Sequence, residues 1–389
     1  MIARPIGRRL LFTSAHHALS GEGVKWSRGL RTLLAAAAIL LSSGIATAQP
    51  PTYSLRTIAE DLRWPWSLAL LPDGDFLVTE REGRLLRVRP SGQRSIVEGT
   101  PPTLFAGQGG YFDIVLHPRF ETTRWVFLSY ADGSKTANGT AVLRARYEDE
   151  QLRDAKALLR VKPDKSTPQH YGGRLLFLPD ETLLMTSGEG FEHREDAQSL
   201  TSELGKVLRF DVDGKARGLA GKGPDTRTRI WSYGHRNPQG LVHIPETDEV
   251  LLHEHGPRGG DELNRVLRGE NYGWPLVTYG VDYSGAYVSP FQRAEGIREP
   301  LWTWTPSIAP SGMAWYTGYR FPAWRSSLFV GALVNREVRR LEFRNGVVQR
   351  EEALFAELDE RIRDLRVFDD RIFILTDSEQ GRLIEVLPH

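Results

Sequence analysis

A loose repeat limits the folds that this chain can adopt. Each copy consists of an apolar run, a turn at Pro, Asp or Gly, and a second, β-rich run. Six copies occur, at residues 68–80, 114–130, 175–189, 241–255, 319–334 and 365–377. Within each copy the apolar residues alternate or run continuously, and no stretch after residue 48 keeps a helical period beyond about two or three turns. Short strands joined by many Gly and Pro turns are typical of an all-β protein.

Six units of roughly 45–75 residues are the pattern of a six-bladed β-propeller, whose four-stranded sheets surround a central channel. A β-sandwich or two stacked β domains is the competing layout, but no Pro/Ser linker interrupts the repeat. We therefore predict a single all-β domain, a six-bladed β-propeller, over residues 49–389. The chain has no cysteine, so a large β core rather than disulfide bonds must stabilise it.

Residues 1–48 are predicted to be an N-terminal extension followed by a signal peptide. The segment KWSRGLRTLLAAAAILLSSGIATA, residues 25–48, has a basic start, an apolar run and small residues before Gln49. We expect cleavage after Ala48, translation starting near Val24, and a periplasmic or secreted mature protein. The apolar run is too short for a comfortable membrane span, so no span is expected in the mature form.

The balance of charge excludes one class of partner. The chain carries 50 Lys and Arg residues against 49 Asp and Glu residues, a net charge of +1. It therefore lacks the basic excess that is typical of a nucleic-acid-binding protein. We expect no nucleic-acid partner, and a monomer or a homodimer in solution.

Unusual polar residues stand just before or after the predicted strands, where the loops at one rim of a propeller converge on the channel. They occur in the segments GQGG, QHYGGRL, SGEG, GHRNPQG, EHGPRGGDE and RIRD. Their candidate side chains are Gln108, His170, Glu189, Arg236, Asn237, Arg361 and Arg363. We predict that these residues meet at the channel mouth although they are far apart in sequence.

Longer versions of these segments carry a family resemblance. They are GQGGYFDIVLHPRF, HYGGRLLF, LGKVLRFDVDG, GHRNPQGL, EHGPRGGDELN, GENYGWP and RIRDLRV. In these segments the chain resembles the soluble quinoprotein sugar dehydrogenases, specifically the aldose sugar dehydrogenase branch that uses pyrroloquinoline quinone (PQQ). The resemblance extends over about residues 53–388. The resemblance implies an enzyme that oxidises the anomeric carbon of aldose sugars to lactones and passes the electrons through PQQ to an unidentified acceptor.

The resemblance also implies catalytic roles. His170 matches the general base, which takes the proton of the anomeric hydroxyl while hydride moves to the quinone, and an imidazole that titrates near neutrality suits this task. Glu189 matches an acid behind His170 that would fix its tautomer, although a plain turn carboxylate is the alternative. Arg236 and Asn237 match residues that contact the quinone oxygens, where a fixed cation would stabilise the growing charge.

The remaining cofactor contacts are implied in the same way. Arg361 and Arg363 match a pair that meets the carboxylates of the cofactor, a task that suits guanidinium groups. The alternative is an exposed pair bridged to an acidic neighbour, which would be Asp359, Glu360 or Asp364. Trp302 and Trp304 match residues that flank the cofactor and the sugar, although a buried Trp is more often part of a core. Gln108 is assigned to the same cofactor site.

Calcium is implied by the segment HGPRGGDE. The family binds one Ca²⁺ against the cofactor through carbonyl groups that match Gly256 and Pro257, and this ion would polarise the quinone carbonyl. A second, structural Ca²⁺ uses ligands that match Glu262 and the carbonyl group of Tyr272.

One position departs from the family pattern. Where the family often has a lysine that reaches a carboxylate of the cofactor, this chain has Val334. Asn335 or Arg336 would replace that lysine after a shift of one or two residues. Otherwise one charge-assisted contact is lost.

Two other functions stay open on the residues alone. A metal-dependent propeller lactonase or other hydrolase would use the segment HEHGP, in which His253 and His255 fall on one face of a strand and could share a metal. A non-catalytic secreted propeller that binds glycans would take up no cofactor. It would leave His170 and the arginines of the channel without a role.

Overall fold

β-Strands make up nearly all the regular structure of the protein. The computed structural model describes residues 53–220 and 228–389, so the predicted extension and signal peptide lie outside the described residues. Within these two ranges the helical elements are α2 (Phe120–Thr123) and the 3-10 turns η1 (Arg194–Ala197), η2 (Pro322–Trp324) and η3 (Ala356–Leu358). No helix in this part of the chain is long and apolar enough to cross a membrane.

The strands form six antiparallel sheets of four strands each. The first three sheets contain β2 (Pro65–Leu70), β3 (Phe76–Glu80), β4 (Arg84–Val88) and β5 (Arg94–Ile96); β6 (Tyr111–Leu116), β7 (Trp125–Ser134), β8 (Ala137–Glu148) and β9 (Gln151–Arg160); and β10 (Gly172–Phe177), β11 (Leu183–Ser187), β12 (Lys206–Phe210) and β13 (Ile230–Tyr233). The other three contain β14 (Pro238–Ile244), β15 (Glu249–Glu254), β16 (Asp261–Arg265) and β17 (Trp302–Trp304); β18 (Pro310–Tyr316), β19 (Ser327–Ala332), β20 (Glu337–Arg344) and β21 (Val347–Leu354); and β22 (Ile362–Phe368), β23 (Arg371–Thr376), β24 (Gly381–Pro388) and β1 (Tyr53–Leu62).

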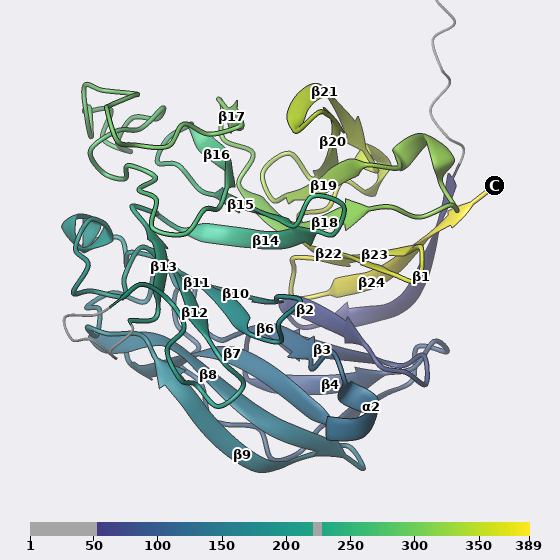
Figure 1. The fold of residues 1–389 in the computed structure, drawn as a ribbon. Coiled ribbons are helices and arrows are strands. Elements are labelled where there is room, and N and C mark those ends of the chain that lie inside the picture. Colours follow the sequence, from purple (N-terminus) through teal and green to yellow (C-terminus); the bar gives the residue numbers. More distant parts are fainter. Residues whose placement is uncertain (1–52, 221–227) are drawn as a thin grey trace, which may run out of the picture. The chain divides into compact units, whose positions relative to one another are not determined.

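The six sheets are arranged as a ring (Figure 1). The innermost strand of each sheet is β2, β6, β10, β14, β18 or β22, and neighbouring innermost strands contact one another around the centre. This arrangement confirms the predicted all-β, six-bladed β-propeller.

Strand β1 closes the ring. It pairs antiparallel with β24, so that Tyr53 lies opposite Pro388 and Leu62 lies opposite Gly381. The last sheet is therefore built from residues at both ends of the described chain. The six predicted repeats did not include this strand.

Most of the predicted repeats coincide with the two inner strands of a sheet, as the copy at 175–189 does with β10 and β11. The fifth copy, predicted to begin at Tyr319, is wrong in its first strand, because β18 has already ended at Tyr316. The turn η2 follows instead, and its Trp324 is fully buried. The apolar residues of this turn imitate the entry of a strand in the sequence.

Apolar side chains fill the spaces between adjacent sheets in six clusters. Between the second and third sheets, for example, Phe127 packs with Leu183 and Leu208, and all three are fully buried. Because the sheets are covered on both faces, their strands are nearly continuous apolar runs. Each such side chain contributes about 1.5–3 kcal/mol when it is removed from water.

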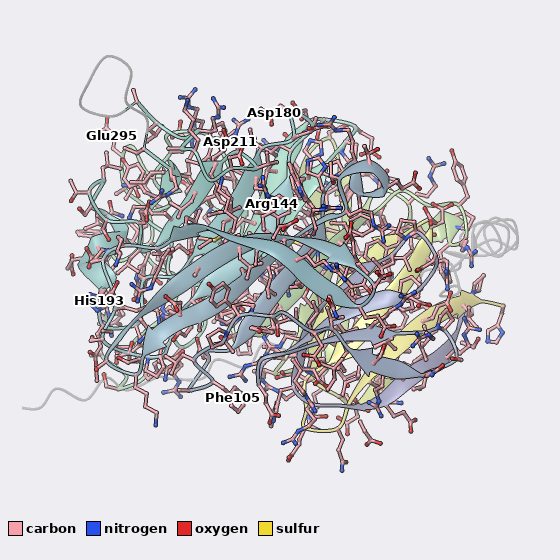
Figure 2. The ribbon with its side chains drawn as sticks, turned by 90° about the horizontal axis from the view of Figure 1, so that it is seen from below. Phe105, Arg144, Asp180, His193, Asp211 and Glu295 are labelled. Atoms are coloured by element: carbon pink, nitrogen blue, oxygen red, sulfur yellow. The ribbon has the colours of Figure 1, made fainter. Side chains whose placement is uncertain are left out.

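Polar contacts on the outside also join the second and third sheets, in the region where Figure 2 labels Arg144 and Asp211. Arg144 donates to the carbonyl oxygen of Val212 at 2.9 Å and pairs with Asp213 at 3.0 Å. Partly exposed ion pairs of this kind contribute at most about 1 kcal/mol each. The apolar clusters therefore provide more of the stability.

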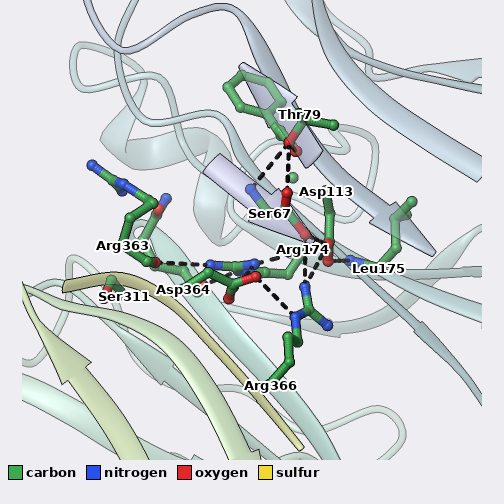
Figure 3. A network of polar contacts seen from close by, with 12 residues as sticks. Ser67, Thr79, Asp113, Arg174, Leu175, Ser311, Arg363, Asp364 and Arg366 are labelled. Carbon is green, nitrogen blue, oxygen red and sulfur yellow. Dashed lines mark hydrogen bonds and ion pairs between the residues drawn. The ribbon is translucent and has the colours of Figure 1, made fainter. Parts of the chain in front are cut away.

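Charged side chains occupy the centre of the ring and form what we call the central network: Asp113 of β6, Arg174 of β10, and Asp364 and Arg366 of β22 (Figure 3). Arg174 Nη1 lies 2.9 Å from Asp364 Oδ1, and Arg366 Nε lies 2.9 Å from Asp364 Oδ2. Arg366 also pairs with Asp113, which accepts a hydrogen bond from Ser67 of β2 at 2.5 Å. Two guanidinium groups and two carboxylates give this network a net charge of zero.

Candidate functional site

The predicted site residues gather at one rim of the propeller, which we call the site rim. At this rim the chain enters each innermost strand and leaves the strand that follows it. Just before the innermost strands lie Gln108, His170, Arg236, Asn237 and Arg361; Arg363 lies near the start of β22, and Glu189 lies just after β11. The topology of the ring thus brings together residues from four sheets.

His170 and Glu189 form a buried pair. His170 Nδ1 lies 2.9 Å from Glu189 Oε1, and the two residues are 4% and 0% exposed. The ring of Phe191 meets the imidazole edge-on, with 5.2 Å between ring centroids. His170 Nε2 has no hydrogen-bond partner within the described residues, so this nitrogen is open to a ligand.

The backbone around His170 is held by close contacts. His170 has a φ of +44°, and its backbone N–H donates to Gln108 Oε1 at 2.8 Å. The N–H of Gln108 donates in turn to the carbonyl oxygen of Pro168 at 2.9 Å. A Cβ at Gly188 would lie 2.2 Å from the carbonyl oxygen of His170, so only glycine fits there. The segments GQGG and SGEG therefore position the imidazole.

Burial sets the protonation of the pair. Burial, and then the charge of Arg236, lower the pKa of His170 well below its ordinary value of 6.5. Burial also raises the pKa of Glu189 to about 7, against the opposing effect of Arg236. His170 is therefore neutral near pH 7. With Glu189 ionised, Nδ1 donates to it and Nε2 is left as an acceptor, which is the form that can act as a base.

The guanidinium group of Arg236 is buried and only partly bonded. Its Nη1 donates to the carbonyl oxygen of Gly256 at 2.6 Å and to that of His255 at 3.2 Å, and its backbone N–H donates to Glu254 at 2.6 Å. Its Nε is buried without a hydrogen-bond partner among the described residues. A buried donor left unpaired costs about 1–3 kcal/mol, and an oxygen of a ligand would remove that cost.

Beside His170 lies a pocket of about 730 Å³, which we call the arginine pocket. Two of its arginines share one carboxylate: Arg361 Nε lies 3.0 Å from Asp377 Oδ2, and Arg363 Nη2 lies 3.0 Å from the same oxygen. His170 lies beside the wall of the pocket, not on it. The other lining residues include the aromatic and polar side chains of Trp64, Trp66, Phe112, Tyr171, Arg81, Gln108, Asn237 and Gln239.

The acidic neighbours of Arg361 and Arg363 in the sequence are engaged elsewhere. Asp359 pairs with Arg336, and Glu360 pairs with Arg382. Asp364 belongs to the central network. The carboxylate that holds both arginines is Asp377, which sequence reasoning missed.

Trp302 and Trp304 are not brought together with the other predicted site residues. Both lie on β17, the outermost strand of its sheet. Trp304 packs in the apolar cluster between the fourth and fifth sheets, and its Nε1 donates to Glu351 at 2.7 Å. The tryptophans that line the arginine pocket are Trp64 and Trp66, from the segment that enters β2.

The predicted metal ligands lie on the loop between β15 and β16 and just beyond it. The carbonyl oxygen of Gly256 accepts from Arg236, and Pro257 follows it in the same loop. Glu262 lies directly opposite Glu254 in the β15–β16 ladder. Burial, and then the nearby Glu254, raise the pKa of Glu262 to about 8.

A small cavity adjoins this carboxylate pair. Its lining includes Glu254, Glu262, Tyr272 and Trp274. Its volume of about 10 Å³ leaves room for one water molecule or one ion. Asn264 Oδ1, on the same strand as Glu262, is buried and has no hydrogen-bond partner in the described structure.

The histidines considered for a hydrolase do not form a metal site. The imidazole of His253 is fully buried and packs against Gly240, while His255 Nε2 lies 2.7 Å from the carbonyl oxygen of Pro310. Across residues 53–220 and 228–389 there is no group of three or more His, Asp or Glu residues that could hold a metal ion. His253 and His255 are therefore not arranged to share a metal in the described part of the chain.

Val334 follows β19, lines the arginine pocket and is 59% exposed. The two residues considered as substitutes for a lysine do not line this pocket: Arg336 pairs with exposed Asp359 at 3.3 Å, and Asn335 is exposed. Val334 therefore brings no charge to the wall of the pocket.

Sequence reasoning missed two charged residues of the arginine pocket, Arg81 and Asp377. Arg81 directly follows β3 and Asp377 directly follows β23, just as Glu189 follows β11 after one glycine. The signal that could have identified them is positional. In these three sheets the first charged residue after the second strand lies at the site rim.

A buried lysine supports the loop that carries His170. Lys165 Nζ donates to the carbonyl oxygens of Thr167 at 2.8 Å and Gln169 at 2.7 Å, and it lies 3.2 Å from the centroid of the Tyr171 ring. No pattern in the sequence indicates this role, because an isolated lysine in a loop is usually exposed.

Two loops meet above the His170 ring. Phe191 and Tyr283 stack with 6.5 Å between ring centroids, and Arg194 pairs with Asp282 at 2.9 Å. Tyr283 is 60% exposed, so one aromatic face beside His170 is open to solvent.

Comparison with known proteins gives consistent matches. The family model described as "Glucose / Sorbosone dehydrogenase" matches residues 62–385. The aldose sugar dehydrogenase YliI of Escherichia coli strain K12 is 38% identical over 368 residues, which cover 90% of this chain and 96% of that protein. The quinoprotein glucose dehydrogenase B of Acinetobacter calcoaceticus is 31% identical over 285 residues, 66% of this chain and 59% of that protein.

Two solved structures are similar in both fold and sequence. The apo form of the soluble aldose sugar dehydrogenase from Escherichia coli has a TM-score of 0.83 and 37% identity, and the match covers 87% of this chain and 100% of that one. The PQQ-bound form of an aldose sugar dehydrogenase from Streptomyces coelicolor has a TM-score of 0.71 and 27% identity, over 87% of this chain and 99% of that one.

Proposed function

The chain belongs to the glucose/sorbosone dehydrogenase family, and from this premise we propose that it is a PQQ- and calcium-dependent dehydrogenase that oxidises the anomeric carbon of aldose sugars to lactones. The related aldose sugar dehydrogenases, one of them solved with PQQ bound, support the substrate class and the cofactor. One observation on this chain carries the proposal. The arginine pocket lies beside the neutral imidazole of His170, whose Nδ1 is hydrogen-bonded to Glu189 and whose Nε2 has no hydrogen-bond partner among the described residues.

The arginine pocket has the chemistry that PQQ requires. Arg361 and Arg363 share a single carboxylate, Asp377, which leaves positive charge for an anionic ligand. The indole rings of Trp64 and Trp66 line the same space and offer flat apolar faces. PQQ is a flat aromatic tricarboxylate, so the residues present fit it.

The protein's part in the reaction follows from the geometry of His170. PQQ, when bound, supplies the two-electron acceptor for the hydrogen on the anomeric carbon. His170 Nε2 accepts the proton of the anomeric hydroxyl, because its imidazole is neutral near pH 7. Glu189 holds the ring through Nδ1 and stabilises the imidazolium that forms. Arg236 provides a fixed positive charge where negative charge develops.

The sugar would enter past the loops that meet above His170. Phe191 and Tyr283 present aromatic faces there, and the Arg194–Asp282 ion pair joins their loops. Aromatic rings with an apolar face and a polar edge suit the mixed surface of a sugar.

Calcium is the second cofactor proposed. The carbonyl oxygen of Gly256 lies beside the guanidinium group of Arg236, so a cation on Gly256 and Pro257 would need an anionic cofactor next to it. There it would act as a Lewis acid. The Glu254–Glu262 pair adjoins the small cavity, and its carboxylate oxygens have the donor chemistry for a structural cation.

We place the enzyme in the periplasm or outside the cell, on the strength of the predicted signal peptide in residues 25–48. Aldoses are then its substrates, and electrons leave the reduced cofactor to an acceptor in the same compartment.

Reconstitution tests the proposed function. The purified protein, supplied with PQQ and Ca²⁺, should oxidise glucose and other aldoses in the presence of an electron-accepting dye. Controls without PQQ, without Ca²⁺, or after chelation should show little turnover. Activity that does not depend on PQQ would contradict the proposal, and hydrolysis of lactones by the cofactor-free protein would favour the hydrolase alternative.

A further inference from the structure

Arg81 is a third guanidinium group in the arginine pocket. It directly follows β3, and its side chain lines the pocket together with Arg361 and Arg363. Those two arginines pair with a carboxylate, whereas Arg81 has no acidic side chain within ion-pair distance among the described residues. Its Nη2 donates instead to two carbonyl oxygens, those of Gly107 at 2.5 Å and Gly109 at 3.2 Å.

The rest of the Arg81 guanidinium is unassigned. Its Nε is buried without a hydrogen-bond partner, and its Nη1 donates to no group in the part of the chain that the structure describes. Burial, and then the nearby charge of Arg363, lower the pKa of Arg81, but an arginine stays protonated in a protein. The Phe105 ring lies 5.5 Å from this guanidinium group, and Asp377 is the nearby carboxylate that opposes the lowering of its pKa. A half-buried cation that has no ion pair of its own is unfavourable, and a bound anion would reduce that penalty.

Arg81 also decides the charge of the pocket. Three guanidinium groups, those of Arg81, Arg361 and Arg363, face the single carboxylate of Asp377, which leaves a net charge of +2. A ligand with at least two carboxylates would neutralise this excess.

The excess compensates for an uncharged position elsewhere in the pocket lining. Val334 lines the same pocket and carries no charge, and Arg336 is held outside it by Asp359. The positive charge absent from the end of β19 is therefore present at the end of β3, on a different sheet of the ring.

We propose that Arg81 is a cofactor-binding residue, which donates from Nη1 to a carboxylate of PQQ and supplies the positive charge missing at Val334. The inference rests on the proposed function, because PQQ is the polycarboxylate concerned.

Calorimetric titration of the protein with PQQ tests this role. Arg81→Gln should weaken PQQ binding about tenfold to hundredfold, the range expected for one charge-assisted hydrogen bond. Arg63→Gln is the matched control, since it removes the same charge from an exposed residue that pairs with Glu82 outside the pocket, and it should change binding less than about twofold. Val334→Lys, added to Arg81→Gln, should restore most of the lost affinity.

The double variant separates charge from structure. Arg81 also holds the turn that presents Gln108, and Val334→Lys cannot repair that turn. An affinity loss that Val334→Lys does not restore would overturn the proposal, as would unchanged binding by Arg81→Gln. If Arg81→Gln does not fold, Arg81→Lys takes its place; it should lose less than tenfold in affinity, and a hundredfold loss would count against the role of the charge.

A second probe separates this inference from the proposed function. Trimesate, a flat benzene tricarboxylate, should also bind in an Arg81-dependent manner. Binding of trimesate without binding of PQQ would contradict the proposed cofactor and keep the role of Arg81 as a carboxylate-binding residue. Binding of neither would contradict both.

Discussion

The central network and the arginine pocket are built from the same two kinds of side chain, but they differ in their balance of charge. In the central network two guanidinium groups meet two carboxylates, and every charged group has a partner (Figure 3). In the arginine pocket three guanidinium groups meet one carboxylate. Strand β22 contributes to both, with Asp364 and Arg366 in the first and Arg363 in the second.

The difference shows how one ring can serve two purposes. A balanced, buried network joins the innermost strands, and removal of any one charge would leave the network with a net charge. An unbalanced pocket is unfavourable in the free protein, and an anionic ligand supplies the missing charge. The first arrangement therefore stabilises the fold and the second favours binding.

Breaking the balanced network should have the largest effect on stability. Arg174→Met removes a buried cation that lies 2.9 Å from Asp364 and 4.0 Å from the centroid of the Trp66 ring. We expect the free energy of unfolding to fall by about 3–5 kcal/mol, because Asp364 loses one of its two guanidinium partners and the buried network is left with an excess of negative charge. Urea denaturation measures this change, with Arg144→Met on the outside as a control that should lose at most about 1 kcal/mol. A similar small loss for Arg174→Met would remove the distinction between the regions.

The same deletion in the unbalanced pocket should act on binding instead. Arg363→Met takes one positive charge from a site that has an excess, and Arg361 remains paired with Asp377. We expect the free energy of unfolding to fall by less than it does for Arg174→Met, because the change reduces an excess of positive charge, while the affinity for PQQ falls about tenfold to hundredfold. Denaturation and calorimetric titration of the same sample measure both. A stability loss equal to that of Arg174→Met would show that Arg363 is structural.

The dependence on pH tests His170, which lies beside the arginine pocket, and the effect is smaller. Burial lowers the pKa of His170 well below 6.5, so its imidazole stays neutral as the pH falls to 6.5. Its base form also needs Glu189 to be ionised, and burial raises the pKa of Glu189 to about 7. We therefore expect the acid limb of kcat/KM near pH 7, where Glu189 takes up a proton. The unfolded chain binds a proton on His170 near pH 6.5 and the folded chain does not, so the contribution of His170 to stability is present above pH 6.5 and is lost below it. An acid limb well above pH 7 would contradict the assignment of His170 as the base.

The sequence predicted the fold well because a propeller repeats one local pattern. Alternating and continuous apolar runs marked the two inner strands of most sheets. The exceptions have physical reasons. Strand β1 was not predicted because it pairs with β24, more than 300 residues away, and a local pattern does not record such a pairing. The buried Trp324 of a 3-10 turn imitated a strand in the fifth repeat.

The site was predicted less completely. Motifs located His170, Glu189, Arg236 and Asn237 because glycines and polar residues cluster around them. Asp377 and Arg81 stand in ordinary strand ends, so their role depends on the ring that brings β3 and β23 to the same rim. Trp302 and Trp304 were assigned by resemblance, and the structure places them on an outermost strand, because position in a motif does not specify which strand of a sheet faces the channel.

The most direct test of the charge difference is a titration of the wild-type protein with PQQ, in the presence of Ca²⁺, at low and at high salt. We predict saturable binding, an unfolding temperature that rises with the concentration of PQQ, and an affinity that falls as salt screens the positive pocket. Absence of saturable binding, with an unfolding temperature that PQQ does not change, would contradict the claim that the arginine pocket is built for an anionic cofactor.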